Sequence, residues 1–304
     1  SEEITAPTNF DLPSGRKLVI EPLVRRDNEV GVDGFFPCAV LLNNDLSGGL
    51  PEILRNIKQP VLPPLALGWN KRLKSEHFTE YRGVANEFAK LIDIDPWLID
   101  PMFRNCGSVD FKSTEGNECL ESQVETLLTD ITAKYQEYGI EKEPFVIVKA
   151  DAGTYGMGIM VARSVDDVKQ LNRKQRNKMA SSKEGNQRSS VIIQEGVYTM
   201  ETVPSDSGPA VAEPVVYMID QWVAGGFYRV HTGRGQQDNL NAPGAEFRPL
   251  AFAESCSTPD GNAAPDAQPN RFYAYGVIAR LAMLAAAREI APHAKTSSQV
   301  ESAT

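Results

Sequence analysis

The stretch FVIVKADAGTYGMGIM, residues 145–160, constrains the fold more than any other part of the sequence. An apolar run of strand type ends in Lys149 and passes at once into a loop with glycine at three of six positions, Gly153, Gly156 and Gly158. Glycine lets backbone N–H groups turn inward and approach a phosphate chain without interference from a Cβ atom. A lysine fixed on the strand beside such a loop can hold a nucleotide phosphate by its charge.

The spacing of the glycines disfavours two common nucleotide folds. GTYGMG is neither the GxGxxG of a dinucleotide fold nor the GxxxxGK[ST] of a P-loop, and the lysine precedes the loop. The loop alone leaves a second interpretation open, a glycine-rich β-turn with Lys149 extending into solvent. Other segments must decide between the two.

Two helices are predicted in the first half of the chain. Apolar side chains recur every three to four residues across 76–92, which is one face of a helix, and Ser75 stands at the expected N-cap. A second run of the same period covers 120–135. Strand-like pieces at 17–24 and 36–44 come before both helices and indicate a small α/β unit.

From residue 145 onward the pattern changes to strands rich in β-branched residues, with a helix at about 164–180 between the first two. VAGG at 223–226 predicts the tight turn between the last two strands. A final helix from 270 to 290 is expected to stop at Pro292. Three segments poor in large apolar groups are predicted to be mobile. They are 201–211, 254–270 and the tail after His293.

Composition excludes several classes of protein. A chain of 304 residues with 41% hydrophobic composition can bury a substantial core. Its net charge of -9 argues against a nucleic-acid binder, and it has neither a membrane-length apolar run nor a secretory signal, so a cytoplasmic protein is expected. The cysteines form no CxxC pair, which favours reduced thiols over a disulfide framework or a zinc site. They are Cys38, Cys106, Cys119 and Cys256.

Two further stretches carry polar groups at strand ends. In VIIQEGV an apolar strand is followed by Gln194, Glu195 and a glycine, the composition expected where a strand meets an adenine edge, although an ordinary edge strand is the alternative. YRVHTGRGQQDNLNAPGAEFRPL at 228–250 concentrates polar residues between two strands, more densely than a solvated loop requires. Its polar residues and turn glycine are Arg229, Arg234, Asn239, Asn241 and Gly244.

The order of these motifs resembles the ATP-grasp superfamily, including glutathione synthetase, whose arginine strand and Asn-Leu-x-x-x-Gly turn are similar to YRVHTGRGQQDNLNAPG. VKADAGTYGMGIM, VIIQEGVYT, AEPVVYMIDQW, GGFYRVHTGR and NLNAPG are together more similar to glutamate-cysteine ligases of the proteobacterial type. The resemblance covers 141–292 and extends through LLNNDLSGGLPEIL, NKRLKSEHF and IDPWLI in the earlier half.

The resemblance implies an α/β (α+β), two-lobed, ATP-grasp-like fold. Residues 1–140 would form an N-terminal α/β and helical domain on the substrate side, and 141–304 the nucleotide-binding domain. The implied reaction joins the γ-carboxylate of L-glutamate to the amino group of L-cysteine through an acyl phosphate, using ATP and Mg²⁺, as the first step of glutathione synthesis. Acyl phosphates hydrolyse readily, so the glycine loop would serve as a lid that excludes water.

Site residues follow from the resemblance. Lys149 and the loop glycines would hold the phosphates, and Gln194 with Glu195 would lie near the adenine or ribose. Lys74, favoured over Lys71, would be the second lysine at the nucleotide, with a solvated helix start as its alternative. Catalysis is assigned to Arg229 and Lys149, because phosphoryl transfer depends on positioning and charge neutralisation. The substrate residues would be Arg173, Arg229, Arg234 and Asn239.

The metal ligands are the weakest part of the match. Glu213, Asn239 and Asn241 are the candidates, with Asp220 and Asp238 in reserve. ATP-grasp enzymes usually end in an acid-bearing strand and a Glu-x-Asn, which this chain does not show after its last predicted helix. Two other functions stay open. One is another carboxylate-amine ligase such as a glutathione synthetase-like enzyme, because the loop and the QE strand report ATP and not the amino acids. The other is an inactive nucleotide-binding regulator, which the absence of Glu-x-Asn would allow. A phosphate or substrate role is favoured for Arg173 in its basic run, with a solvated helix face as the alternative.

Overall fold

The chain forms two compact units in a computed structural model, Ser1–Arg72 and Leu73–Thr304. The structure describes residues 4–42, 44, 46, 49–68, 72–111, 116–152, 159–171, 176, 177, 179, 189–249 and 271–301. The predicted loop glycines Gly153, Gly156 and Gly158 lie outside the described residues, as do Lys71 and Arg173.

The first unit is built from short paired strands. β1 (Thr8–Asp11) pairs with β2 (Lys17–Ile20), and β3 (Val24–Arg26) pairs with β4 (Glu29–Gly31), both antiparallel, while β5 (Val40–Leu41) and β6 (Val61–Leu62) run parallel. Two 3-10 turns, η1 (Glu52–Leu54) and η2 (Leu65–Leu67), are the helical elements among its described residues. The Gln59 amide exchanges hydrogen bonds of 2.7 and 2.8 Å with the backbone of buried Val30, acting in place of a strand neighbour.

The second unit contains a four-stranded antiparallel sheet in the order β7-β10-β8-β9. Its strands are β7 (Phe103–Val109), β10 (Ser189–Glu195), β8 (Val146–Ala150) and β9 (Met160–Ala162). Helix α2 (Asn117–Glu137) covers one face, where its fully buried Val124, Leu127 and Ile131 pack in one cluster with strand valines and isoleucines. The predicted boundary at 140/141 thus falls inside this unit, between a helix and strands that share a core.

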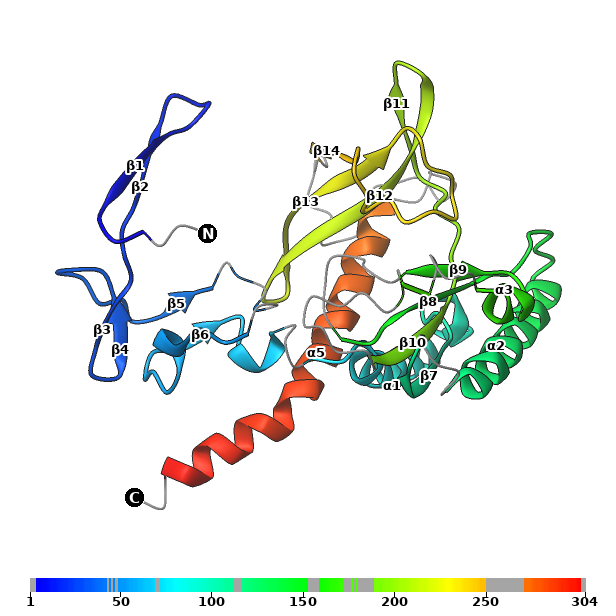
Figure 1. The fold of residues 1–304 in the computed structure, drawn as a ribbon, viewed down its shortest axis with the longest axis horizontal. Helices are drawn as coiled ribbons and strands as arrows, with labels where there is room; N and C mark the ends of the chain where they lie inside the picture. Colours follow the sequence, from blue (N-terminus) through cyan, green and yellow to red (C-terminus); the bar gives the residue numbers. More distant parts are fainter. Residues whose placement is uncertain are drawn as a thin grey trace. The chain divides into compact units, whose positions relative to one another are not determined.

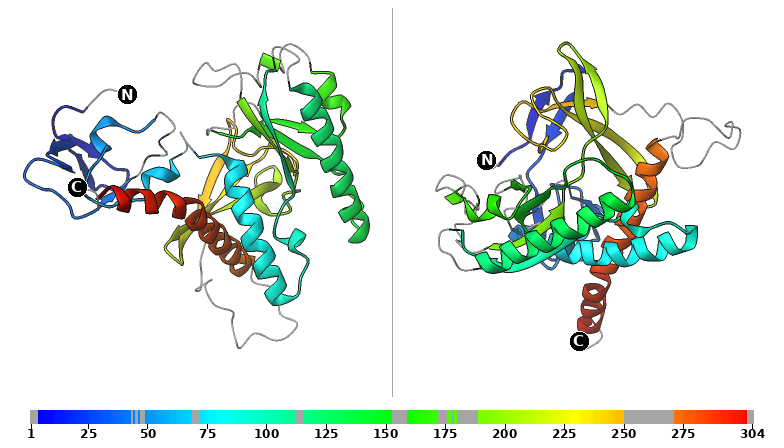
Figure 2. Two further views of the ribbon diagram at one scale, coloured as in Figure 1. Left: turned by 90° about the horizontal axis from the view of Figure 1, so that it is seen from below. Right: turned by 90° about the vertical axis from the view of Figure 1, so that its right-hand side faces the viewer.

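Helix α1 (Lys74–Ile92) lies on the opposite face of this sheet. Its Phe78 ring is 5.8 Å from that of Phe103, which stands in register with Gln194, on the face away from α2. α1 also packs along α5 (Arg271–Glu301) (Figures 1 and 2). In this contact Tyr81, Val84 and Ala85 cluster with Leu281 and Ala285 of α5. The predicted helix is confirmed, and its first residue is Lys74.

A second antiparallel sheet has the order β11-β12-β13-β14, from β11 (Thr202–Ser205), β12 (Gly208–Ile219), β13 (Trp222–His231) and β14 (Glu246–Pro249). Two predictions fail here. The segment 201–211, predicted to be mobile, forms the β11–β12 hairpin, because strand pairing satisfies its backbone without large side chains. The β12–β13 turn is at Asp220 and Gln221, with Asp220 at φ 51°, and VAGG lies within β13.

Helix ends also differ from prediction. α5 continues through Pro292, since a proline can bend a helix without ending it. The N-cap of α1 is Leu73, and Ser75 lies inside the helix. The predicted helix at 164–180 begins with only a short α3 (Asp166–Lys169), and most of the rest, like the predicted mobile segment at 254–270, lies outside the described residues.

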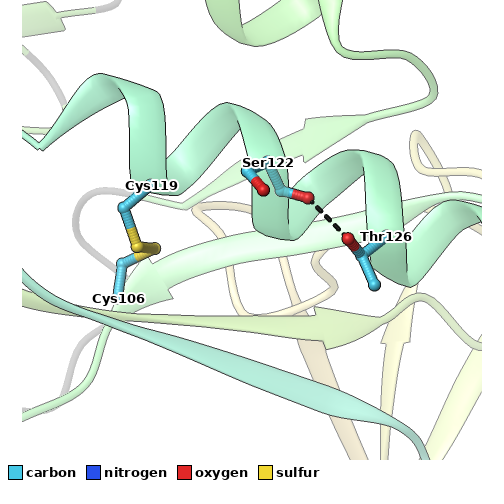
Figure 3. The surroundings of a disulfide bond; sticks show 4 residues. All are labelled: Cys106, Cys119, Ser122 and Thr126. Atoms are coloured by element: carbon cyan, nitrogen blue, oxygen red, sulfur yellow. Dashed lines mark hydrogen bonds between the residues drawn. A yellow bond between two sulfur atoms is a disulfide. The ribbon is translucent and has the colours of Figure 1, made fainter.

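The expectation of reduced thiols is wrong for two of the cysteines. Cys106 on β7 and Cys119 in the first turn of α2 form a disulfide with a Cα–Cα distance of 6.2 Å (Figure 3). Cys106 points to the α2 face, so packing of the helix on the sheet brings the two thiols together. Cys38 is a free, exposed thiol. None of the helices in the described part of the chain is long and apolar enough to cross a membrane.

Candidate functional site

Two lysines from different elements converge at the end of β8. Lys149 is the fourth residue of that strand, and Lys74 begins α1. The Lys74 ammonium donates to the carbonyl oxygens of Ala150 and Asp151, both at 3.1 Å. The structure thus brings together the two lysines that the sequence assigned to a nucleotide.

Their surroundings disfavour two positive charges. Burial lowers the pKa of Lys74 to about 8, with the charge of Lys149 as the second cause, and the Asp151 carboxylate opposes the shift. Burial also lowers the pKa of Lys149, again opposed by Asp151. A bound anion would relieve both the desolvation and the repulsion between the two cations. Neighbouring lysines with perturbed pKa values are typical of a functional site.

Asp151, which sequence reasoning did not single out, lies at the centre of this arrangement. It is fully buried, and its carboxylate accepts hydrogen bonds from Ser75 N at 2.8 Å, Ser75 Oγ at 2.6 Å, Asn105 Nδ2 at 3.3 Å and Ser190 Oγ at 3.3 Å. Its position two residues after Lys149 was the available signal, since alternate residues of a strand share a face.

Gln194 and Glu195 have different surroundings. Gln194 pairs with Ile147 in register, and both share a sheet face with Lys149. Glu195 points to the α2 face, where its carboxylate accepts from Trp97 Nε1 at 3.0 Å and from Met102 N at 2.9 Å. Burial raises the pKa of Glu195. Adjacent strand residues point to opposite faces, so only Gln194 of this pair faces the lysines.

Arg229 and Glu213 form a cross-strand pair in the second sheet. They are opposed in register on β13 and β12, and the Arg229 Nη1 group donates to Glu213 Oε1. Their side chains are 23% and 33% exposed. The Nε group of Arg229 is buried, with no hydrogen-bond partner in the described chain. The partly exposed Arg229 side chain is therefore fixed at Nη1, and its Nε hydrogen-bonding capacity is not used by the described residues.

The loop after β13 is folded by its own hydrogen bonds. Asn241 N donates to Asn239 Oδ1 at 2.9 Å, and Gly235 N donates to Asp238 Oδ2 at 2.8 Å. Leu240, between the two asparagines, is fully buried and anchors the turn. Arg234 is exposed and Asn239 is half-buried. The structure records no direct contact between this loop and the lysines within the described residues.

The proposed metal ligands do not fit a magnesium site as they stand. The Glu213 carboxylate faces the Arg229 guanidinium, and that positive charge disfavours a divalent cation at the same oxygens. Asn239 Oδ1 is bound to the backbone of Asn241. The reserve Asp220 is exposed at the β12–β13 turn, and Asp238 holds Gly235. Among the described residues no group of three His, Cys, Asp or Glu side chains could hold a metal.

Comparison with known proteins identifies the family of the chain. The sequence profile of the glutamate-cysteine ligase family, GshA, matches residues 1–290. The crystal structure of the "Putative gamma-glutamylcysteine synthetase" from Methylobacillus flagellatus KT is 59% identical, with a TM-score of 0.84, over 95% of this chain and 67% of that one. No curated protein matches the chain. With the family profile matching nearly its whole length, this chain belongs to the glutamate-cysteine ligase family.

Proposed function

We propose that this chain joins the γ-carboxylate of L-glutamate to the amino group of L-cysteine at the expense of ATP, as the first step of glutathione synthesis. One observation in the structure carries the nucleotide part of the proposal. Lys74 and Lys149 converge at the end of β8, directly before a glycine-rich segment, with pKa values lowered mainly by burial. Membership of the glutamate-cysteine ligase family supplies the two amino acids.

The nucleotide would lie with its phosphates at the two ammonium groups. Lys74 and Lys149 each place a positive charge at the same end of the sheet, and a triphosphate carries the opposite charge. Gln194, on the same sheet face, offers an amide to the base or ribose. On the opposite sheet face, the Glu195 carboxylate holds this strand by accepting hydrogen bonds from Trp97 Nε1 and Met102 N. We propose an ATP-grasp-like arrangement, with the nucleotide bound at the first sheet.

The reaction proceeds in two steps. In the first, a γ-carboxylate oxygen of glutamate attacks the γ-phosphorus of ATP, the bond to ADP breaks, and an acyl phosphate forms. In the second, the neutral amine of cysteine attacks the acyl carbon, phosphate leaves, and the amine loses a proton. Both steps need charge neutralisation and exclusion of water more than a nucleophilic side chain. The lysines supply the first of these requirements.

Arg229 is proposed to hold the substrate carboxylate or the transferred phosphoryl group. The Arg229 side chain is partly exposed, and the Glu213 carboxylate fixes its guanidinium through Nη1. Because Glu213 is engaged in this way, no step is assigned to a metal held by Glu213, Asn239 and Asn241. Magnesium enters the proposal only as part of the ATP substrate. Substrate roles for Arg173, Arg234 and Asn239 remain predictions, as does the cytoplasmic location.

The proposal is tested by turnover with defined substrates. The protein should form γ-glutamylcysteine and release phosphate only when ATP, magnesium, glutamate and cysteine are all present. Glutamate labelled with ¹⁸O in its γ-carboxylate should transfer one label to the released phosphate, because the acyl phosphate passes that oxygen on. Phosphate release that needs neither glutamate nor cysteine would exclude this ligase. Turnover with another amine in place of cysteine would favour a different carboxylate-amine ligase.

A further inference from the structure

The carboxylate of Asp151 ties together the elements that carry the two lysines. The residue directly follows β8, which contains Lys149, and it accepts two hydrogen bonds from Ser75 in the first turn of α1, which begins with Lys74. The remaining carboxylate bonds come from Asn105 of β7 and Ser190 of β10. Strands β7, β8 and β10 and helix α1 therefore meet at one buried charge.

The backbone of Asp151 strengthens the same junction. Its carbonyl oxygen accepts from Lys74 N at 3.0 Å and from Lys74 Nζ at 3.1 Å, and its own N–H donates to Ser190 O at 2.8 Å. These contacts fix the start of α1 against the end of β8. The carboxylate also occupies the positive end of α1, because it accepts from Ser75 N. Phosphate recognition is then left to the lysine side chains.

We propose that Asp151 is a positioning residue for ATP, which sets Lys74 beside Lys149 and keeps Lys74 charged. This inference rests on the proposed nucleotide site. Asp151 is fully buried and holds both lysine-bearing elements through direct hydrogen bonds, so its contribution is made through the lysines and not by contact with the substrate.

If Asp151 acts on Lys74 through its charge, the pH dependence of ATP binding should change when that charge is removed, which a purely structural cap would not cause. Among the described residues, Lys149 disfavours the ammonium form of Lys74 and Asp151 favours it. One turn further along α1, His77 pairs with Glu289 of α5 at 3.1 Å. Removing the Asp151 charge should lower the pKa of Lys74 below its value of about 8, so the ammonium is lost at a lower pH.

The test compares Asp151→Asn with the intact protein in equilibrium binding of ATP across pH 6 to about 10, a range that spans the pKa of lysine when lowered and when ordinary. Asparagine keeps the shape and can still accept from Ser75 N. We expect ATP affinity to fall by roughly 10- to 100-fold, by analogy with the loss seen when a group that orients a metal-binding side chain is removed. The pH at which affinity declines should also move downward. Glutamate and cysteine KM values should change little.

Two further variants separate position from charge. Ser75→Ala removes one hydrogen bond but keeps the carboxylate, so ATP affinity should fall less and its pH midpoint should stay in place. Asp130→Asn is the matched control, because Asp130 pairs with Arg104 of β7 at 2.5 Å on the α2 face, away from the lysines. Its ATP affinity and pH midpoint should equal those of the intact protein.

The proposal is overturned if Asp151→Asn binds ATP normally with an unchanged pH midpoint, or if Asp130→Asn reproduces its effect. Loss of thermal stability alone, with normal ATP binding, would make Asp151 a structural cap only. Binding and turnover are measured separately. ATP binding without γ-glutamylcysteine formation would overturn the proposed function while Asp151 is still tested, and absence of ATP binding would overturn both.

Discussion

Arg229 on β13 lies directly opposite Glu213 on β12, and its guanidinium donates to that carboxylate while its buried Nε has no hydrogen-bond partner among the described residues. The sequence placed these two residues in different roles, one as a substrate ligand and one as a metal ligand. Their pairing indicates instead that Glu213 orients Arg229. A carboxylate that fixes an arginine is a weaker candidate for magnesium.

Arg229→Ala should remove about 2 to 4 kcal/mol of transition-state stabilisation, as loss of one preorganised donor does, and this loss is measured as a fall in kcat/KM. Arg229→Lys should recover little of it, since lysine lacks the fixed donor geometry. Steady-state kinetics check both variants. Normal kinetics with a lowered unfolding midpoint would assign Arg229 to packing.

Glu213→Gln distinguishes orientation from metal binding. Glutamine can still accept from Arg229, so the variant should keep most of its activity and show an unchanged magnesium dependence. Magnesium titration of initial rates checks this expectation. A large increase in the magnesium needed for half-maximal rate would restore Glu213 as a metal ligand.

The pKa of Lys74 predicts how ATP use depends on pH. Its ammonium form is present below about 8 and is lost as pH rises through that value, so KM for ATP should rise above pH 8. Lys74→Arg should reduce this rise, because arginine stays protonated, while Lys149, whose pKa is also lowered, can still lose its proton. KM for ATP measured from pH 6 to about 10 checks it, a range that covers both lowered and ordinary lysine pKa values. A flat wild-type profile would contradict the assignment.

Glu195 should affect stability and leave ATP affinity nearly unchanged. Burial raises the pKa of Glu195 in the folded protein above the ordinary 4.5. The contribution of Glu195 to the free energy of unfolding is therefore fully present below its unfolded pKa and is lost as pH rises through its folded pKa. Glu195→Gln should remove that part of the pH dependence of unfolding. Urea unfolding at several pH values, with ATP binding as the second readout, checks this. A large loss of ATP affinity would place the Glu195 carboxylate at the nucleotide instead.

The disulfide between Cys106 and Cys119 should stabilise the second unit. Closing a loop across a sequence separation of 13 is worth about 3 kcal/mol in the chain-entropy account. Dithiothreitol should lower the free energy of unfolding by about that amount. Cys106→Ser should have the same effect without reductant, whereas Cys38→Ser should not. If denatured, unreduced protein shows four reactive thiols, the pair is reduced as the sequence first suggested.

The sequence predicted those elements whose periodicity is strong. α1, α2, β8, β10, β12 and β13 were predicted near their observed positions, because apolar spacing reports the buried face directly. β7 was missed, since FRNCGSV has few β-branched residues. Its alternation still matters, because Asn105 reaches Asp151 on one face while Cys106 reaches α2 on the other.

Tertiary relationships were the main source of error. The α1 cap, the β12–β13 turn and the disulfide each depend on contacts that local sequence does not encode. Asp151 replaces Ser75 as the group that binds the first turn of α1, from 76 residues away. The proximity of Lys74 and Lys149 could not be predicted from residue spacing, which does not place the start of a helix beside the end of a strand. The family resemblance suggested it, because it assigned both lysines to the nucleotide.

The most direct measurement of the central claim is a crystal structure with a nonhydrolysable ATP analogue and magnesium. The account predicts the triphosphate between the ammonium groups of Lys74 and Lys149, with the base toward Gln194. A nucleotide bound elsewhere on the protein, with the two lysines contacting none of its phosphates, would contradict it.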